Sequence, residues 1–101
     1  MRYQLQTEAP FDSWYYGLDG SIRRRIAATL DRMASGNLGD YRPLRNAPGI
    51  YERRLTFGGG IRIYFAWDGP TLIILLGAGN KSSQLQDISA ARSTWESYNA
   101  V

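Results

Sequence analysis

The stretch from residue 50 to residue 81, IYERRLTFGGGIRIYFAWDGPTLIILLGAGNK, constrains the fold more than any other part of the chain. It holds two runs that alternate apolar and polar residues, followed by the unbroken apolar run TLIILL. Alternation with period two is typical of β-strands, and a run that is apolar on both faces is typical of a central strand. With turns at GGG and DGP, the stretch predicts a three-stranded antiparallel meander whose last strand is covered on both sides.

The first of these turns sets the register of the predicted hairpin. A three-residue loop at residues 58–60 pairs Phe57 with Ile61 and Leu55 with Ile63, which keeps the apolar side chains on one face. A two-residue loop would instead place Leu55 beside an arginine and break that face. We therefore predict the three-residue loop.

The predicted register gathers basic side chains at one end of the sheet. Arg54 lies directly across from Tyr64, and Arg62 lies one diagonal step away. The third strand runs antiparallel to the second, so its end brings Lys81 back beside Arg62. Any one of these residues alone is better explained as a solvated strand or loop residue. Their convergence beside a glycine-rich rim indicates a functional cluster.

The composition excludes several kinds of chemistry. A chain of 101 residues is expected to form one domain, residues 1–101, with a single core. It contains no histidine, so a histidine-based nuclease or hydrolase is excluded and acid–base catalysis must use Lys, Tyr, Asp, Glu or an arginine-assisted water. It contains no cysteine, which leaves only scattered carboxylates as metal ligands. We expect no metal and no cofactor.

The apolar stretches of the sequence are short. None approaches the ~20 residues that a membrane helix requires, and no signal peptide opens the chain. The lack of cysteine also suits a reducing compartment. We therefore expect a cytoplasmic protein that makes no membrane contact.

Arginine carries almost all of the positive charge. The formal net charge is +3, and Lys81 is the single lysine among the 12 Lys and Arg residues. Guanidinium groups are planar, always charged and well matched to phosphate, so a polyanionic partner is plausible. Arg42 and Arg45 lie in the Gly- and Pro-containing segment 38–49, which we predict to be a loop leading into the basic end of the sheet. Both are predicted to help hold a phosphate backbone.

The start of the chain predicts a strand and a short helix. Residues 1–8 alternate in polarity, and Asp12 is a suitable N-cap for the helix that follows. This helix carries Trp14, Tyr15 and Tyr16, which are candidates for a partner-binding surface because aromatic anchors dominate interface energetics. Helical spacing of aromatic residues suits a place in the core equally well.

Two longer helices are also predicted. The segment SIRRRIAATLDRMASGN at residues 21–37 has one apolar stripe and ends in a glycine stop signal. After the third strand, Ser83 and the glutamine three residues later fit a capping box that opens the last helix. We predict an apolar stripe on that helix from Leu85 through Ile88 to Trp95. The stripe of the earlier helix consists of Ile22, Ile26, Leu30 and Met33.

Four motifs in order, FDSWYYGL, SGNLGDYRPL, GIYERRLTFGGGIRIYF and LLGAGNKSSQLQDISAA, carry a family resemblance over nearly the whole chain. The sequence resembles the RelE/ParE superfamily of type II toxins, and most closely the HigB-like subgroup of addiction-module killer proteins. The resemblance implies an α+β fold, with an N-terminal strand and a helical hairpin packed on a mostly antiparallel sheet, and a C-terminal helix. It also implies a cognate antitoxin partner, in this subgroup typically a helix-turn-helix protein from the same operon.

The resemblance further implies a function, since many members cut messenger RNA on the ribosome without a metal. Arg54 matches the arginine of the E-x-R motif, Arg62 that of G-x-R-x-Y-F, and Lys81 the lysine of G-x-K-S-S-Q. Cleavage requires a deprotonated 2′-hydroxyl, charge neutralisation at the phosphate and a protonated leaving oxygen. The arginines would hold the scissile phosphate, Lys81 would act as base or charge stabiliser, and Tyr64 would stack on a base or relay a proton.

One departure from the superfamily leaves the acid open. Its well-studied nucleases often use a histidine, or a tyrosine near the C-terminus, for acid–base work. This chain has no histidine, and Tyr98 lies on the predicted last helix with nothing linking it to the cluster. Three functions follow as alternatives: a ribosome-dependent mRNA endonuclease, a non-catalytic ParE-like poison of DNA gyrase, and a folded member without activity. The G-x-K-S-S-Q motif favours the first over the second.

Overall fold

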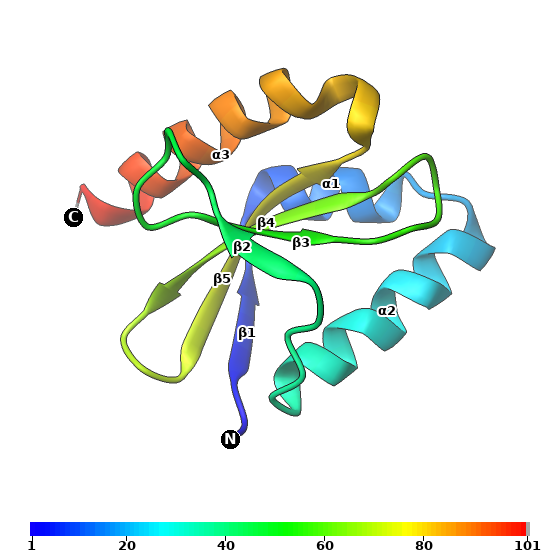
Figure 1. Cartoon of the computed structure of the whole chain (residues 1–101), viewed down its shortest axis with the longest axis horizontal. Coiled ribbons are helices and arrows are strands. Elements are labelled where there is room, and N and C mark those ends of the chain that lie inside the picture. The colour runs from blue at the N-terminus through cyan, green and yellow to red at the C-terminus, as the bar shows by residue number, and fades with distance from the viewer. Residues whose placement is uncertain (101) are drawn as a thin grey trace.

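The computed structural model describes residues 1–100 and has an α+β fold with one five-stranded sheet and three α-helices (Figure 1). The strand order is β1-β5-β4-β3-β2, and all neighbouring strands are antiparallel except β1 and β5. This architecture confirms the predicted fold class. The strands are β1 (Gln4–Thr7), β2 (Tyr41–Pro43), β3 (Tyr51–Arg54), β4 (Arg62–Asp68) and β5 (Leu72–Gly79). The helices are α1 (Ala9–Tyr16), α2 (Gly20–Ala34), the 3-10 turn η1 (Lys81–Ser83) and α3 (Gln84–Asn99).

The first helix begins earlier than predicted. Glu8 is the N-cap and Pro10 lies in the first turn of α1, so Asp12 is a first-turn residue and the predicted cap is wrong. Proline suits this position because its fixed φ is helical and a first-turn residue needs no N–H donor. In the second helix the predicted stripe is confirmed: Ile26 and Met33 are fully buried, and its other two members are partly buried against the same core.

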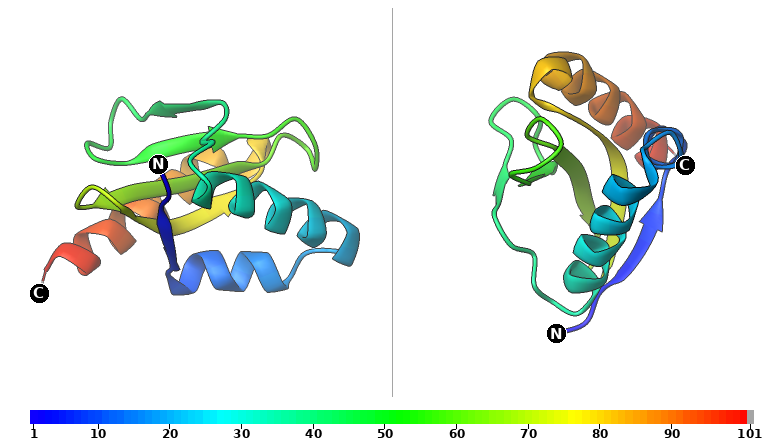
Figure 2. Two further views of the ribbon diagram at one scale, coloured as in Figure 1. Left: turned by 90° about the horizontal axis from the view of Figure 1, so that it is seen from below. Right: turned by 90° about the vertical axis from the view of Figure 1, so that its right-hand side faces the viewer.

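The last strand of the meander is central, as its unbroken apolar sequence predicted. Ile73 and Leu75 of β5 enter the core on the side of α1 and α2. Ile74 and Leu76 enter a second core beneath α3. The helices therefore cover both faces of this strand, while β1 and β2 lie at opposite margins of the sheet (Figure 2).

The register of the hairpin differs from the predicted one by two residues. Arg54 pairs with Arg62, and Glu52 rather than Arg54 lies opposite Tyr64. The connection is wider than three residues because Gly58, Gly59 and Gly60 all adopt positive φ, at 63°, 77° and 78°. Such conformations are open to glycine at little cost. A shift of two residues keeps each side chain on its predicted face, so both arginines still lie on one side of the sheet.

The segment at residues 38–49 is not all loop, because Tyr41–Pro43 forms the edge strand β2 against β3. The cap of the last helix also differs from the prediction. Ser83 is the N-cap residue of α3, as predicted, but its side chain makes no capping hydrogen bond to that helix. The capping box lies at η1 instead, where the side chain of Asn80 accepts a hydrogen bond from the Ser82 N–H and the Asn80 N–H donates to Ser83 Oγ. No helix of residues 1–100 is long and apolar enough to cross a membrane.

The apolar stripe of α3 begins one turn later than predicted. Leu85 is 87% exposed and is not part of the core. Ile88, Ala91 and Trp95 pack beneath the helix, and Tyr98 extends this stripe. Leu85 lies in the first turn of α3, next to the exposed capping turn.

Candidate functional site

The backbone brings the predicted basic cluster to one end of the sheet. Arg54 on β3 is the cross-strand neighbour of Arg62 on β4, which in turn pairs with Gly79 on β5. Lys81 follows directly after β5, and its N–H donates to the carbonyl of Gly59 in the hairpin loop at 3.3 Å. Three basic residues from separate parts of the sequence therefore lie around the glycine loop at residues 58–60. We call this site, formed by Arg54, Arg62 and Lys81, the basic rim.

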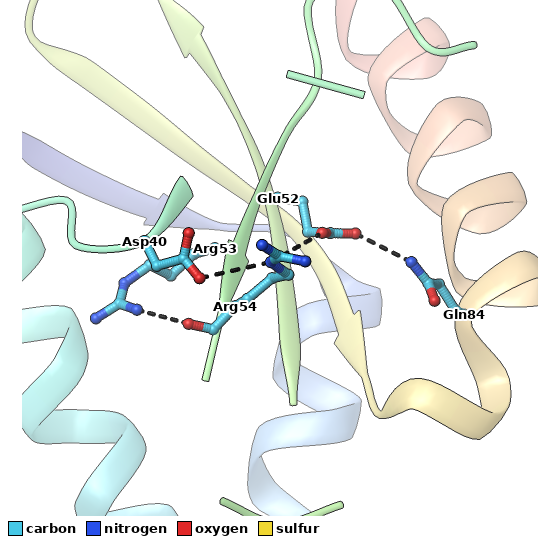
Figure 3. Close-up of polar contacts among 5 residues, drawn as sticks. All are labelled: Asp40, Glu52, Arg53, Arg54 and Gln84. Carbon is cyan, nitrogen blue, oxygen red and sulfur yellow. Dashed lines mark hydrogen bonds and ion pairs between the residues drawn. The ribbon is translucent and has the colours of Figure 1, made fainter. Parts of the chain in front are cut away.

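Arg54 is held by two carboxylates. Its Nε lies 3.5 Å from Asp40 Oδ2 and 3.9 Å from Glu52 Oε1 (Figure 3). Glu52 is only 4% exposed, and its other oxygen accepts a hydrogen bond from Gln84 Nε2 on α3 at 3.2 Å. The charge of Arg54 is therefore largely balanced within the protein, and its side chain ties the sheet to the first turn of α3.

Arg62 and Lys81 differ from Arg54 because neither forms an ion pair within residues 1–100. The Nε of Arg62 is buried and has no hydrogen-bond partner among these residues, whereas Lys81 is exposed. An unpaired guanidinium with a nearby ammonium is a favourable site for a phosphate group. The positive charge that is free to bind an anion at this rim comes from these two residues.

Tyr64 lies in the core beneath α3 and is 0% exposed. A base cannot stack on a ring that is fully buried, so this predicted role does not fit the structure. Burial raises the pKa of the phenol, and the carboxylates of Glu52 and Asp87 raise it further, while Arg62 opposes them. A phenol with a raised pKa stays protonated at neutral pH and is a weaker acid than an exposed tyrosine, so it can donate a hydrogen bond but is a poor source of a proton.

Tyr64→Phe is expected to stabilise the protein selectively at high pH. An exposed tyrosine in the unfolded chain loses its proton near pH 10, while the raised pKa keeps folded Tyr64 protonated. The unfolded state therefore binds fewer protons above pH 10, and stability falls as pH rises beyond that value. Phenylalanine does not titrate, so the substitution removes this pH-dependent fall in the free energy of unfolding, which is at most about 1.4 kcal/mol per pH unit. Urea unfolding at pH 8 and pH 10.5 measures it; an equal difference between the proteins at both pH values would contradict the prediction.

The two arginines predicted to bind substrate lie near the same face of the sheet. Arg42 is exposed on β2, where it pairs with Glu52 and so continues the row that contains Tyr64. Arg45 is exposed in the following loop and lines a cavity of about 260 Å³ together with Leu85 and other residues of α3. The basic rim thus extends from Lys81 towards the edge strand.

The predicted partner surface is partly core and partly exposed. Tyr16 is 71% exposed. Trp14 and Tyr15 are half-buried, with ring centroids 5.5 Å and 5.8 Å from that of Phe11 in the core. The two inner rings therefore anchor α1 in the core, and the partner-binding role of this surface stays a prediction.

Sequence reasoning missed the acidic residues around the basic rim. Glu52 could have been found, because it lies two residues before Arg54 and therefore on the same face of the strand. The partners Asp40 and Gln84 depend on how the loop and α3 pack, and no local pattern indicates them. Tyr98 donates a hydrogen bond to Asp68, the last residue of β4, at the far end of the sheet. Residues 1–100 contain no group of three potential metal ligands.

Comparison with known proteins supports the fold. No family model matches the chain. A mutant of the Escherichia coli toxin RelE in the free state superimposes with a TM-score of 0.70 at 19% identity, over 92% of this chain and 97% of that one. The RelBE2 toxin–antitoxin complex of Mycobacterium tuberculosis superimposes with a TM-score of 0.57 at 20% identity, over 80% of this chain and 100% of that one. The RelB–RelE complex of Methanococcus jannaschii superimposes with a TM-score of 0.59 at 19% identity, over 79% of this chain and 94% of that one.

The chain therefore shares the fold of these RelE structures, as the resemblance predicted. At the level of sequence, the chain is 37% identical over 93 residues to an uncharacterized protein of Haemophilus influenzae, covering 91% of this chain and 92% of the relative. The chain belongs to the same family as this Haemophilus protein. Membership of the HigB-like subgroup stays a prediction.

Proposed function

We propose that the chain is the toxin of a type II toxin–antitoxin module and cleaves messenger RNA on the ribosome without a metal. The observation that carries the proposal is the unpaired guanidinium of Arg62 beside Lys81 at the exposed rim of a RelE fold. In this proposal the protein acts in the cytoplasm, where ribosomes and messenger RNA are available.

The residues of the rim suit the steps of such a cleavage. The 2′-oxygen forms a bond to phosphorus while the bond from phosphorus to the 5′-oxygen breaks, so one proton leaves the 2′-hydroxyl and another reaches the 5′-oxygen. Arg62 would neutralise the charge that develops on the phosphate, a contribution that depends on a preorganised donor. Arg54, braced by Asp40 and Glu52, would mainly hold the strand pair in place. Lys81 would serve as base or charge stabiliser.

Other predicted residues extend this site. Arg42 and Arg45, both exposed, would contact the phosphates that flank the scissile one. Tyr64 would take part only as a buried hydrogen-bond donor, since its phenol stays protonated. A cognate antitoxin, which we expect to be a helix-turn-helix protein from the same operon, would bind at the surface around Trp14, Tyr15 and Tyr16. Several structural neighbours are themselves complexes of a RelE toxin with a RelB antitoxin.

Induction of the protein in a bacterial host tests the function directly. Primer extension across abundant transcripts is expected to show cleavage that requires translation, and purified protein should cut a message bound to ribosomes but not the free message. A parallel supercoiling assay with purified DNA gyrase tests the alternative. Intact messages together with inhibited supercoiling would establish the gyrase poison instead. Absence of any growth defect would support an inactive member.

Lys81→Ala is expected to lower ribosome-dependent cleavage by about 10²-fold, because it removes the exposed ammonium from the rim. Lys81→Arg separates the two roles of this residue. Arginine keeps the charge but does not release its proton at neutral pH, so it should restore cleavage only if Lys81 acts as a charge stabiliser. Cleavage that is unaffected by the alanine substitution would remove Lys81 from the site.

A further inference from the structure

Two cavities lie between α1 and α3, beside the end of β5, and the first of them also reaches Gly58 and Asn80, next to the basic rim. Their volumes are about 290 Å³ and 330 Å³. Trp14 of α1, Ala78 of β5 and Asp87 of α3 line both of them, so we treat them as one feature, the α1–α3 groove. Neither the proposed cleavage nor the arginine cluster uses this groove.

The charge of the groove is opposite to that of the chain. Asp87 is the one ionisable residue that lines either cavity, and no lysine or arginine lines them, although the net charge of the protein is +3. Asp87 is half-buried and accepts a hydrogen bond from Ser83 Oγ, but it forms no ion pair within residues 1–100. A partly desolvated carboxylate without a cation is stabilised by a cationic ligand.

The carboxylate is fitted closely to the sheet. A Cβ at Gly79 would overlap Asp87 Oδ2 and would also crowd Ser83 Oγ, so the absence of a side chain at Gly79 lets Asp87 lie against β5. Asp87 is therefore held at the groove by a glycine below it and a serine beside it. A carboxylate held in this way is preorganised to receive a donor.

The wall of the α1–α3 groove opposite Asp87, formed by α1, and the end of β5 at its base suit a bound peptide. Trp14 is half-buried, which leaves part of its indole in the groove, and an indole face attracts a guanidinium or ammonium group. β1 pairs with β5 only as far as Leu75, so the outer edge of residues 76–79 has no partner strand within residues 1–100. Gly77 and Ala78 of this stretch line the groove, so a bound segment would contact them directly.

We propose that the α1–α3 groove binds an arginine-bearing segment of a protein partner, with the guanidinium stacked on Trp14 and paired with Asp87. Arginine fits better than lysine because its planar fork can both stack on an aromatic ring and pair with a carboxylate. RNA is disfavoured here, since its phosphates would be repelled by Asp87. The identification of this partner as the antitoxin rests on the proposed function, whereas the binding of an arginine peptide does not.

Two capped peptides test the chemistry of the groove with the full-length protein. They share the sequence Ala-Leu-Xaa-Leu-Ala, where Xaa is arginine in one and its uncharged analogue citrulline in the other. Calorimetry, with the indole N–H signal of Trp14 followed by NMR, is expected to show at least about tenfold tighter binding of the arginine peptide. Asp87→Asn should abolish that preference. Asp31→Asn removes the same charge from an exposed site on α2 and should leave it intact.

Several outcomes would overturn the proposal. Equal binding of the two peptides, or an equal effect of Asp87→Asn and Asp31→Asn, would show that no arginine site exists. Dimerisation of the wild-type protein that Asp87→Asn abolishes would assign the groove to a second copy of the chain. If Asp87→Asn fails to fold, as judged by circular dichroism, Trp14→Leu replaces it and should also remove the preference.

Ribosome-dependent cleavage by the same variants separates this proposal from the proposed function. Loss of peptide binding with unchanged cleavage supports a docking groove. Loss of cleavage in Asp87→Asn with unchanged peptide binding would overturn it, because Asp87 would then belong to the catalytic site. A wild-type protein that binds the arginine peptide but cuts no message would refute the nuclease and leave the groove standing.

Discussion

Arg62→Ala is expected to lower ribosome-dependent RNA cleavage by about 10² to 10³-fold and to abolish growth arrest. Arg62 is the arginine of the rim whose guanidinium has no carboxylate partner within residues 1–100, and its Nε is already stripped of water. A donor that is desolvated and fixed before the substrate arrives needs little reorganisation when charge develops on the phosphate. Removing this donor therefore destabilises mainly the transition state, so kcat should drop more than KM rises.

Two control variants make this prediction specific. Arg24→Ala removes the same charge from an exposed position on α2 and should retain near wild-type cleavage. Arg62→Lys keeps a positive charge but loses the planar fork, so we expect partial activity. Urea unfolding should place Arg62→Ala within about 1 kcal/mol of the wild type, because Arg62 forms no ion pair within residues 1–100 and the substitution removes a buried Nε that has no hydrogen-bond partner there. Full toxicity of a folded Arg62→Ala variant would remove the rim as the catalytic site.

Much of the fold was predictable because its signals are local. Two glycine-marked turns and an unbroken apolar strand were enough to define the meander and to place β5 at the centre of the sheet. The register of the first hairpin was not predictable, because three consecutive glycines permit loops of several widths. The face of the sheet on which each side chain lies was still predicted correctly, because the register differs by two residues and not by one.

The candidate site was predictable only at the level of the backbone. Arg62 and Lys81 meet at the rim because strand pairing requires it. Whether an arginine is free or paired depends on side chains brought from elsewhere, as Asp40 and Gln84 show for the network around Arg54. The burial of Tyr64 has the same origin, because α3 covers it from a distant part of the sequence.

Phe65→Ala is expected to destabilise the protein by about 3 to 5 kcal/mol, the cost of truncating a buried phenylalanine. Phe65 is 0% exposed in the middle of β4, and its ring lies 5.8 Å from that of Tyr51, 6.0 Å from that of Tyr41 and 5.4 Å from that of Trp67. A loss of this size is a large share of the stability of a small domain. Urea unfolding measures it directly, and near-ultraviolet circular dichroism should report the disturbed aromatic cluster.

The same variant separates the core from the catalytic rim. Phe65 packs in the core on the side of α1 and α2, whereas Arg62 lies three residues earlier in the same strand and on the opposite face. Cleavage per folded molecule should therefore be retained at low temperature, while Phe65→Leu, which keeps most of the apolar volume, should lose much less stability. A stability loss below about 1 kcal/mol for Phe65→Ala would mean that the cavity collapses, which contradicts a close-packed aromatic cluster. Loss of cleavage in proportion to Arg62→Ala would show instead that the two faces of β4 are coupled.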